Sequence, residues 1–123
     1  MKDLFCIDFD FLGIPVKIFC KTYTDEEVVR KEFHYKYTNG GASFHVKPTE
    51  TEYHAFILFN DSGNFKNKNI YKNPALYAHE LLHSTKFYMG VLGIENEEVE
   101  CLFLGYLVKL YCNLLEQYEN NRK

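Results

Sequence analysis

In the first half of the chain, short apolar runs separated by polar or glycine-containing turns predict β-strands. Residues 14–23 and 43–47 are β-prone, and residues 53–60 are apolar at both alternating positions, as in a strand that is covered on both faces. Residues 61–73 are rich in Asn, Lys, Gly and Ser, which predicts a surface loop. We therefore expect a sheet in this half.

The segment between residues 23 and 43 supports two interpretations. Residues 33–37 alternate cleanly and are followed by Asn39-Gly40-Gly41, a strong turn signal, so we expect a hairpin over about residues 32–47. Thr24-Asp25-Glu26-Glu27 can instead open a short helix through a capping box. The part of the chain before Phe33 therefore stays open between strand and helix.

The second half reads as two helices. Asn73-Pro74 is an N-cap followed by proline at the first helical position, and Gly90 or Gly93 can end this helix in a left-handed cap. An apolar stretch over residues 99–115 predicts the second helix. We expect helices over 74 to about 90 and 96 to about 118, packed on a small, mostly antiparallel sheet from residues 4–60. The predicted fold is one α+β domain spanning residues 1–123.

Composition narrows the class of protein. The chain has 46% hydrophobic and 17% aromatic residues, which predicts a folded core. Its net charge is −3 and it has no Lys/Arg cluster, so we expect no nucleic-acid partner and no anionic membrane surface. Glu100, Lys109 and Asn113 interrupt the long apolar stretch, which argues against a membrane span.

The redox and targeting signals indicate a cytoplasmic protein. Asp3, Asp8 and Asp10 break the pattern of a secretory leader. The four cysteines contain no C-x-x-C pair, and we interpret them as small buried hydrophobes in a reducing compartment: Cys6, Cys20, Cys101 and Cys112.

The candidate chemistry lies in His79-Glu80-Leu81-Leu82-His83, an HExxH pattern inside the first long helix. Histidines at i and i+4 project from one helix face, so both imidazoles can bind one zinc ion. Glu80 lies between them, where its carboxylate can take a proton from a metal-bound water. The competing interpretation is an ordinary amphipathic helix with two exposed histidines and a solvated glutamate.

A catalytic zinc ion normally has three protein ligands and a water. Candidates for the third follow the turn at residues 90–93, in Glu95-Asn96-Glu97-Glu98-Val99-Glu100. An αα-hairpin returns this segment alongside the first helix. Acidic residues also favour the first turn of any helix, because they interact well with its dipole.

These residues carry a resemblance. HExxH, followed after about fifteen residues by Glu98-Val99-Glu100-Cys101-Leu102-Phe103, resembles gluzincin zinc metallopeptidases and in particular the small HExxH proteins of phages and prophages. In those proteins the second helix often reads E-x-x-A-Y-L, so Cys101 takes the small position and Leu102 replaces the tyrosine. The resemblance covers roughly residues 73–110.

The resemblance implies a set of roles. His79 and His83 would be zinc ligands, Glu80 the general base and Glu98 the third ligand. Helical phase disagrees on the last, because the apolar positions of residues 99–115 centre nearer to Glu100 than to Glu98. Both glutamates therefore stay candidates, with Glu98 first.

Five other residues carry a weaker signal. His54, in the last strand before the motif helix, is the most plausible additional ligand. For Tyr88 and Tyr106 the alternatives are oxyanion stabilisation and core packing, and packing is favoured. The remaining histidines, His34 and His45, fall in predicted strands, where surface or hydrogen-bonding roles are usual.

The leading hypothesis is a zinc-dependent, metallopeptidase-like protein that hydrolyses an amide bond in a peptide or protein substrate. If the gene belongs to a phage, the protein would work in the host cytoplasm. The alternative is a non-catalytic phage structural or host-interaction protein in which a zinc site stabilises the fold. A metal-free interaction module is the third possibility. No pattern in the sequence indicates an oligomeric state, a specific substrate or a cleavage preference.

Overall fold

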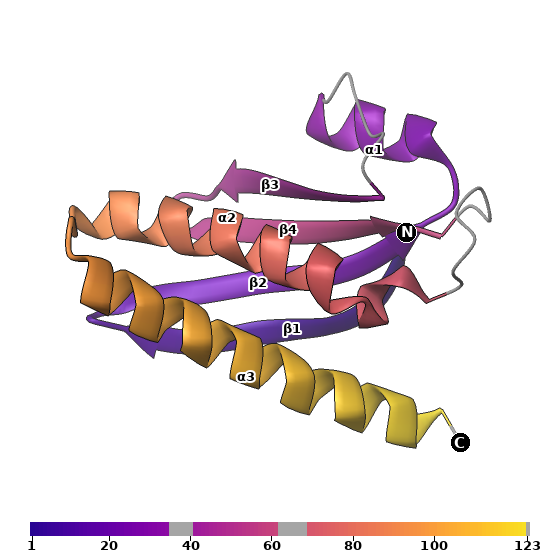
Figure 1. Ribbon diagram of the computed structural model, residues 1–123. Helices are drawn as coiled ribbons and strands as arrows, with labels where there is room; N and C mark the ends of the chain where they lie inside the picture. Colours follow the sequence, from indigo (N-terminus) through magenta and orange to yellow (C-terminus); the bar gives the residue numbers. More distant parts are fainter. Residues whose placement is uncertain (35–40, 62–68, 123) are drawn as a thin grey trace.

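Four strands form one sheet with three helices packed on it (Figure 1). The computed structural model describes residues 1–34, 41–61 and 69–122. The strands are β1 (Lys2–Phe11), β2 (Ile14–Tyr23), β3 (Ala42–Pro48) and β4 (Tyr53–Asn60). The helices are α1 (Glu26–Phe33), α2 (Pro74–Leu92) and α3 (Glu97–Asn121), with a short 3-10 turn, η1 (Ile70–Lys72), before α2.

The spatial order of the strands is β1-β2-β4-β3. The β1–β2 and β3–β4 pairs are antiparallel, and β2 runs parallel to β4. The predicted α+β class with a mostly antiparallel sheet is confirmed. The one parallel pair was not predicted, and it puts β3 at an edge of the sheet.

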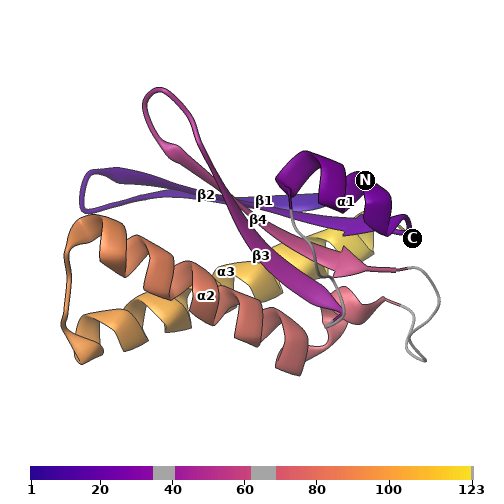
Figure 2. The ribbon, with the colours of Figure 1, turned by 90° about the horizontal axis from the view of Figure 1, so that it is seen from above.

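The two faces of the sheet are covered unequally (Figure 2). Helices α2 and α3 lie on one face and bury the main core, which includes Ile18, Ile57 and Leu107. Helix α1 lies on the other face over a smaller cluster of Tyr23, Val29, Phe56 and Leu58. This double coverage explains why residues 55–60 are all buried and apolar at most positions.

Between β2 and β3 the helical interpretation is confirmed. Asp25, rather than Thr24, caps α1, and its side chain accepts a hydrogen bond from the Glu27 amide. His34 ends the helix in the left-handed conformation. The expected hairpin over residues 32–47 is therefore wrong at its start, and β3 pairs with β4. The expected strand 33–37 and turn 39–41 fall largely on residues 35–40, outside the described residues.

The ends of α2 agree with the sequence prediction. The Asn73 side chain accepts a hydrogen bond from the Ala75 amide, with Pro74 at the first helical position. Gly93 has φ 69°, and the Ile94 amide donates to the Met89 carbonyl at 2.9 Å. Helix α3 starts at an Asn96 cap and runs antiparallel to α2. None of the described helices has the length and apolarity needed to cross a bilayer.

Candidate metal centre on helix α2

Helix α2 brings the two motif histidines together. Nε2 of His79 and Nε2 of His83 lie 3.1 Å apart, and both side chains are exposed. Two imidazole ligands at about 2.05 Å from one tetrahedral ion would have nitrogens about 3.3 Å apart. The distance between the two Nε2 atoms is therefore close to the distance that a shared zinc ion requires.

Glu80 lies beside the histidine pair in a buried position. Its side chain is 5% exposed, and none of the hydrogen bonds formed by the described residues ends on its carboxylate. Burial raises the pKa of this carboxyl, and the neighbouring His83 and His79 partly offset the rise. A buried carboxylate that no described residue hydrogen-bonds is suited to interact with a water, an ion or a substrate group. These residues thus fit a metal ion with an adjacent general base.

The other wall of the site comes from the edge strand β3. Ala42, Ser43 and Phe44 face the two histidines and Glu80 across an open hollow of about 270 Å³. The Phe44 ring is nearly parallel to the His83 ring, with an interplanar angle of 9° and centroids 6.3 Å apart. The site therefore combines a helix face with the beginning of a strand that lies about 35 residues earlier in the chain.

The hydrogen-bonding direction of β3 follows from two backbone hydrogen bonds of its hairpin. The Asn60 amide donates to the Gly41 carbonyl and the Thr49 amide donates to the Glu52 carbonyl, each at 2.7 Å. In an antiparallel pair the bonded positions alternate, so odd-numbered residues of β3 point their backbone groups toward β4. The amides and carbonyls of Ala42, Phe44 and Val46 therefore point toward the free edge.

That free edge is blocked at its far end. Pro48 occupies the next outward position and has no amide proton to donate. The outward N–H groups of the strand are thus confined to the part that adjoins the hollow and its immediate continuation. Natural proteins commonly place proline and charged residues on edge strands to prevent pairing with other chains. In β3 the proline lies at the far end, so the segment next to the histidines keeps its outward N–H groups.

The structure does not bring Glu98 to the histidine pair. Glu98 is exposed on α3, whereas Glu100 is half-buried and forms an ion pair with Lys86 of α2. Among the described residues no group of three or more His, Cys, Asp or Glu side chains lies close enough to hold an ion. Of the two candidates, Glu100 is therefore the one that contacts α2, in agreement with the helical phase.

The offset along the helix pair explains this arrangement. Glu100 of α3 lies opposite Lys86 of α2, and the two helices are antiparallel. His83 precedes Lys86 by three residues, so the residue of α3 at the level of His83 is Phe103, three residues after Glu100. Phe103 is five residues beyond Glu98, which is about 7.5 Å along the axis. Glu98 therefore lies well past the level of the site, toward the α2–α3 turn.

The remaining histidines lie away from the site. The His54 ring makes an edge contact with Phe19 and bonds the Glu52 carboxylate at 2.9 Å, on the sheet face opposite α2. His45 is buried, stacks on Phe33 of α1 and bonds the Ser43 hydroxyl at 2.8 Å. The alternative in which His54 completes the site has no support in this arrangement.

The two tyrosines have different environments. Tyr88 is fully buried and its hydroxyl donates to the Lys17 carbonyl at 3.4 Å, which confirms the packing interpretation. Burial raises the pKa of Tyr88 to about 12. Tyr106 is exposed and makes an edge contact with Phe9 on the flank of α3 nearest β1. Neither tyrosine lines the hollow.

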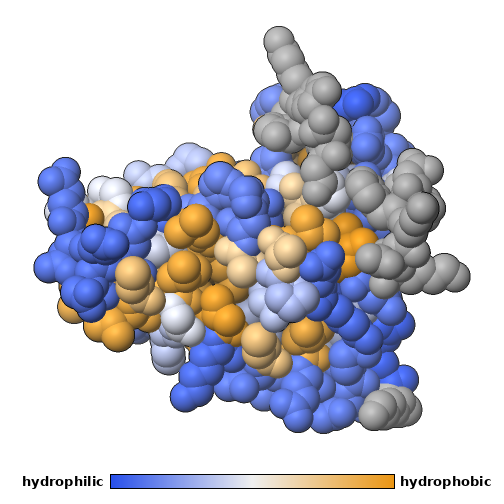
Figure 3. All heavy atoms as spheres, in the orientation of Figure 1, coloured by the Kyte–Doolittle hydropathy of each residue, from blue (hydrophilic) through white to orange (hydrophobic). Residues whose placement is uncertain are grey.

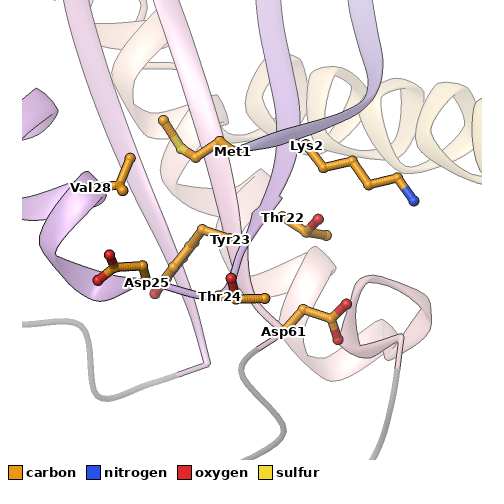
Figure 4. A pocket seen from close by; sticks show the side chains of 8 residues that line it. All are labelled: Met1, Lys2, Thr22, Tyr23, Thr24, Asp25, Val28 and Asp61. Atoms are coloured by element: carbon orange, nitrogen blue, oxygen red, sulfur yellow. The ribbon is translucent and has the colours of Figure 1, made fainter.

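A second hollow of about 320 Å³ lies outside the ends of the parallel strands β2 and β4 (Figure 4). Asp25 and Asp61 contribute carboxylates, and Thr22 and Thr24 contribute hydroxyls. Asp25 is already used to cap α1. This hollow is larger than the one at the histidines, but its described lining has no pair of histidines and no buried carboxylate, so the histidine site is the better candidate.

Sequence reasoning found the three α2 residues and missed Ala42, Ser43 and Phe44. A strand over residues 43–47 was expected, but its place beside α2 depends on the pairing of β4 with both β2 and β3. No protein-family model, no curated protein and no solved structure matches the chain in the three comparisons.

Proposed function

We propose that this protein is a zinc-dependent, metallopeptidase-like hydrolase whose site is the hollow between α2 and β3. The observation that carries the proposal is the combination of convergent His79 and His83 nitrogens with the buried Glu80 carboxylate, which no described residue hydrogen-bonds. A hydrogen bond between the two imidazoles would also give the 3.1 Å spacing, but it would not account for the buried acid beside them.

His79 and His83 would hold the ion, and the ion when bound would supply a Lewis acid that lowers the pKa of a water. Glu80 accepts a proton from water in the hollow and later donates it to the leaving amine. Its raised pKa suits this exchange, because a general base works best when its pKa approaches the working pH. The described arrangement supplies two protein ligands, one fewer than catalytic zinc sites usually have.

The substrate class follows from the edge of β3. Outward amides and carbonyls of Ala42, Phe44 and Val46 can pair with an extended peptide by strand addition. A peptide held there lies beside the hollow that contains Glu80 and the histidines. We therefore propose an extended segment of a peptide or protein as substrate, in a cytoplasmic setting that suits the four free cysteines.

The alternative of a zinc site that only braces the fold has less support. A bracing ion stabilises a domain by joining separate segments, as structural zinc sites do. Both imidazoles of this pair come from α2 alone, so an ion held by them would join no second element. A bracing role also gives no reason for the buried Glu80 carboxylate.

The test combines metal binding with hydrolysis. Purified protein should bind about one zinc ion per chain, measured by elemental analysis after dialysis and by chelator competition. His79→Ala and His83→Ala should each abolish binding. Glu80→Gln should keep the metal and lose cleavage of a mixed library of unstructured peptides, followed by mass spectrometry.

His54→Ala is the matched control, since it removes an imidazole on the opposite face of the sheet. It should change neither zinc binding nor cleavage. Zinc binding that is absent from the wild-type protein, or that survives both motif histidine substitutions, would refute the metal site. Metal binding without any peptide cleavage would support the metal site but refute the proposed hydrolase activity.

A further inference from the structure

A groove between α2 and α3, separate from the histidine hollow, has an apolar floor and an acidic rim. It has a volume of about 410 Å³ and is lined by Leu82, Lys86, Glu95, Glu97, Glu100, Cys101 and Leu104. That volume falls within the range of about 300–1,000 Å³ that ligand pockets usually have. It contains none of the residues that line the histidine hollow.

The floor is more exposed than helix packing alone requires. The Leu82 side chain belongs to α2 and is 40% exposed, Cys101 is exposed and Leu104 is half-buried. Figure 3 shows apolar side chains gathered over the face formed by α2 and α3, with hydrophilic ones around the turn between them. These exposed apolar side chains are available to contact the apolar side of a partner.

The charge of the rim indicates the charge that the partner should carry. Glu95, Glu97 and Glu100 face one cation, Lys86, which Glu100 already binds. Glu95 and Glu97 form no ion pair with any described residue, and the exposed Glu98 adds to the same end of α3. Acidic residues in the first turn are favourable for α3 itself, but that effect does not account for an exposed leucine on the neighbouring helix.

We infer that this groove docks a basic amphipathic helical segment of a partner protein, with leucine-like side chains on the floor and Lys or Arg beside Glu95 and Glu97. A groove between two helices suits a third helix that lays its apolar side along it. Complementary charge at the rim sets the orientation and speeds association. The inference does not depend on hydrolysis, because none of the groove residues belongs to the proposed catalytic set.

The test uses a fluorescent helical peptide with leucines at i and i+4 flanked by lysines, titrated with full-length protein in the absence of added metal. A charge-reversed peptide with glutamate in place of each lysine is the comparison. We expect the basic peptide to bind at least about tenfold more tightly, and its affinity to fall as salt is added.

Two pairs of variants test the location. Leu82→Ser should weaken binding by roughly tenfold, whereas Leu102→Ser, an exposed leucine of α3 that does not line the groove, should not change it. Glu97→Gln should weaken binding by about threefold, and Glu116→Gln, the same change elsewhere on α3, should leave it unchanged. Circular dichroism confirms that each variant folds.

Three results would overturn the inference. They are equal binding of the basic and acidic peptides, no detectable binding of the basic peptide, and equal effects of the groove variants and their controls. A concentration-dependent dimer in sedimentation experiments that Leu82→Ser disperses would assign the groove to a second copy of the chain and would equally reject a basic partner.

Discussion

Phe44 lies nearly parallel to His83, with an angle of 9° between the rings. The contact joins the edge strand to the motif helix and limits the orientations that the imidazole can adopt. Groups that orient a metal ligand commonly change metal affinity when they are removed. Phe44 is thus the residue through which the sheet supports the candidate metal centre.

Phe44→Leu should weaken zinc binding by roughly threefold to tenfold, because the leucine keeps apolar volume but leaves the His83 ring free to rotate. Chelator competition measures the change. Phe9→Leu, which alters an aromatic contact with Tyr106 on the far flank, should leave the affinity unchanged. Equal affinities for the wild-type and Phe44→Leu proteins would mean that the ring contact does not orient the ligand.

The third ligand can be tested with two isosteric substitutions on α3. Glu98→Gln should change zinc affinity by less than about twofold, because the side chain lies beyond the level of the histidine pair. Glu100→Gln should likewise spare the metal but lose its ion pair with Lys86. A loss of more than about tenfold for Glu98→Gln would instead mean that the first turn of α3 moves to the ion when it binds.

The free edge of β3 can be tested by removing a single amide proton. Val46→Pro should reduce the affinity of an extended peptide substrate, since it takes away one outward N–H at a position where an edge strand tolerates proline. Val46→Ala keeps the amide and should behave like the wild type. Binding is measured by fluorescence anisotropy with Glu80→Gln as the background, and an unchanged affinity in Val46→Pro would argue against strand addition.

The turn between β3 and β4 gives a pH-dependent contribution to stability. Hydrogen bonds from Lys17 and then His54 hold the pKa of Glu52 below its ordinary value of 4.5. A carboxyl whose pKa is lowered by folding adds stability above its ordinary pKa and loses it as the pH falls through the folded-state value. Stability should therefore decline on acidification below about pH 5.

Glu52→Gln should flatten that decline, when urea denaturation is compared between pH 6 and pH 3. Glu50→Gln, in the same turn and exposed, is the matched control and should follow the wild-type curve. Identical acid dependence in the wild-type and Glu52→Gln proteins would assign the acid loss to other carboxyls.

The junction between η1 and α3 depends on a buried tyrosine. The hydroxyl of Tyr111 donates to the backbone carbonyl of Tyr71 at 2.6 Å, and its ring stacks on Tyr77. Tyr111→Phe keeps the ring but leaves the carbonyl without its donor, so the free energy of unfolding should fall by about 1–2 kcal/mol. Urea denaturation at neutral pH measures this, and Tyr106→Phe, which is exposed, should show almost no change.

Local patterns predicted most elements of the fold correctly. The strands over residues 14–23 and 53–60 and the start of α2 at Pro74 match the structure, because each depends on neighbouring residues alone. The segment before β3 was ambiguous because Phe33 belongs to a strand-like alternation, and the Asp25 cap decided it in favour of helix.

The site was predictable only where one helix contains it. The spacing of His79, Glu80 and His83 is a property of the helix, so the sequence was enough to expect their convergence. The third ligand depends on how far α3 slides along α2, and the wall at Phe44 depends on strand order. Both are set by contacts between distant segments, which no local pattern specifies.

The two strands of the β3–β4 hairpin differ in the number of strands with which they pair. Opening β4 breaks ladders with both β2 and β3, whereas β3 can detach by losing a single ladder. Strand β1, at the other edge, also has one ladder, but it is 10 residues long whereas β3 has 7, so local unfolding should begin at β3. The amide protons of Ser43 and His45, which point toward β4, would then exchange with solvent long before those of β4. Strand β3, which forms one wall of the hollow, is therefore the part of the sheet that opens most easily. A peptide paired with its free edge would give β3 the second ladder that β4 already has.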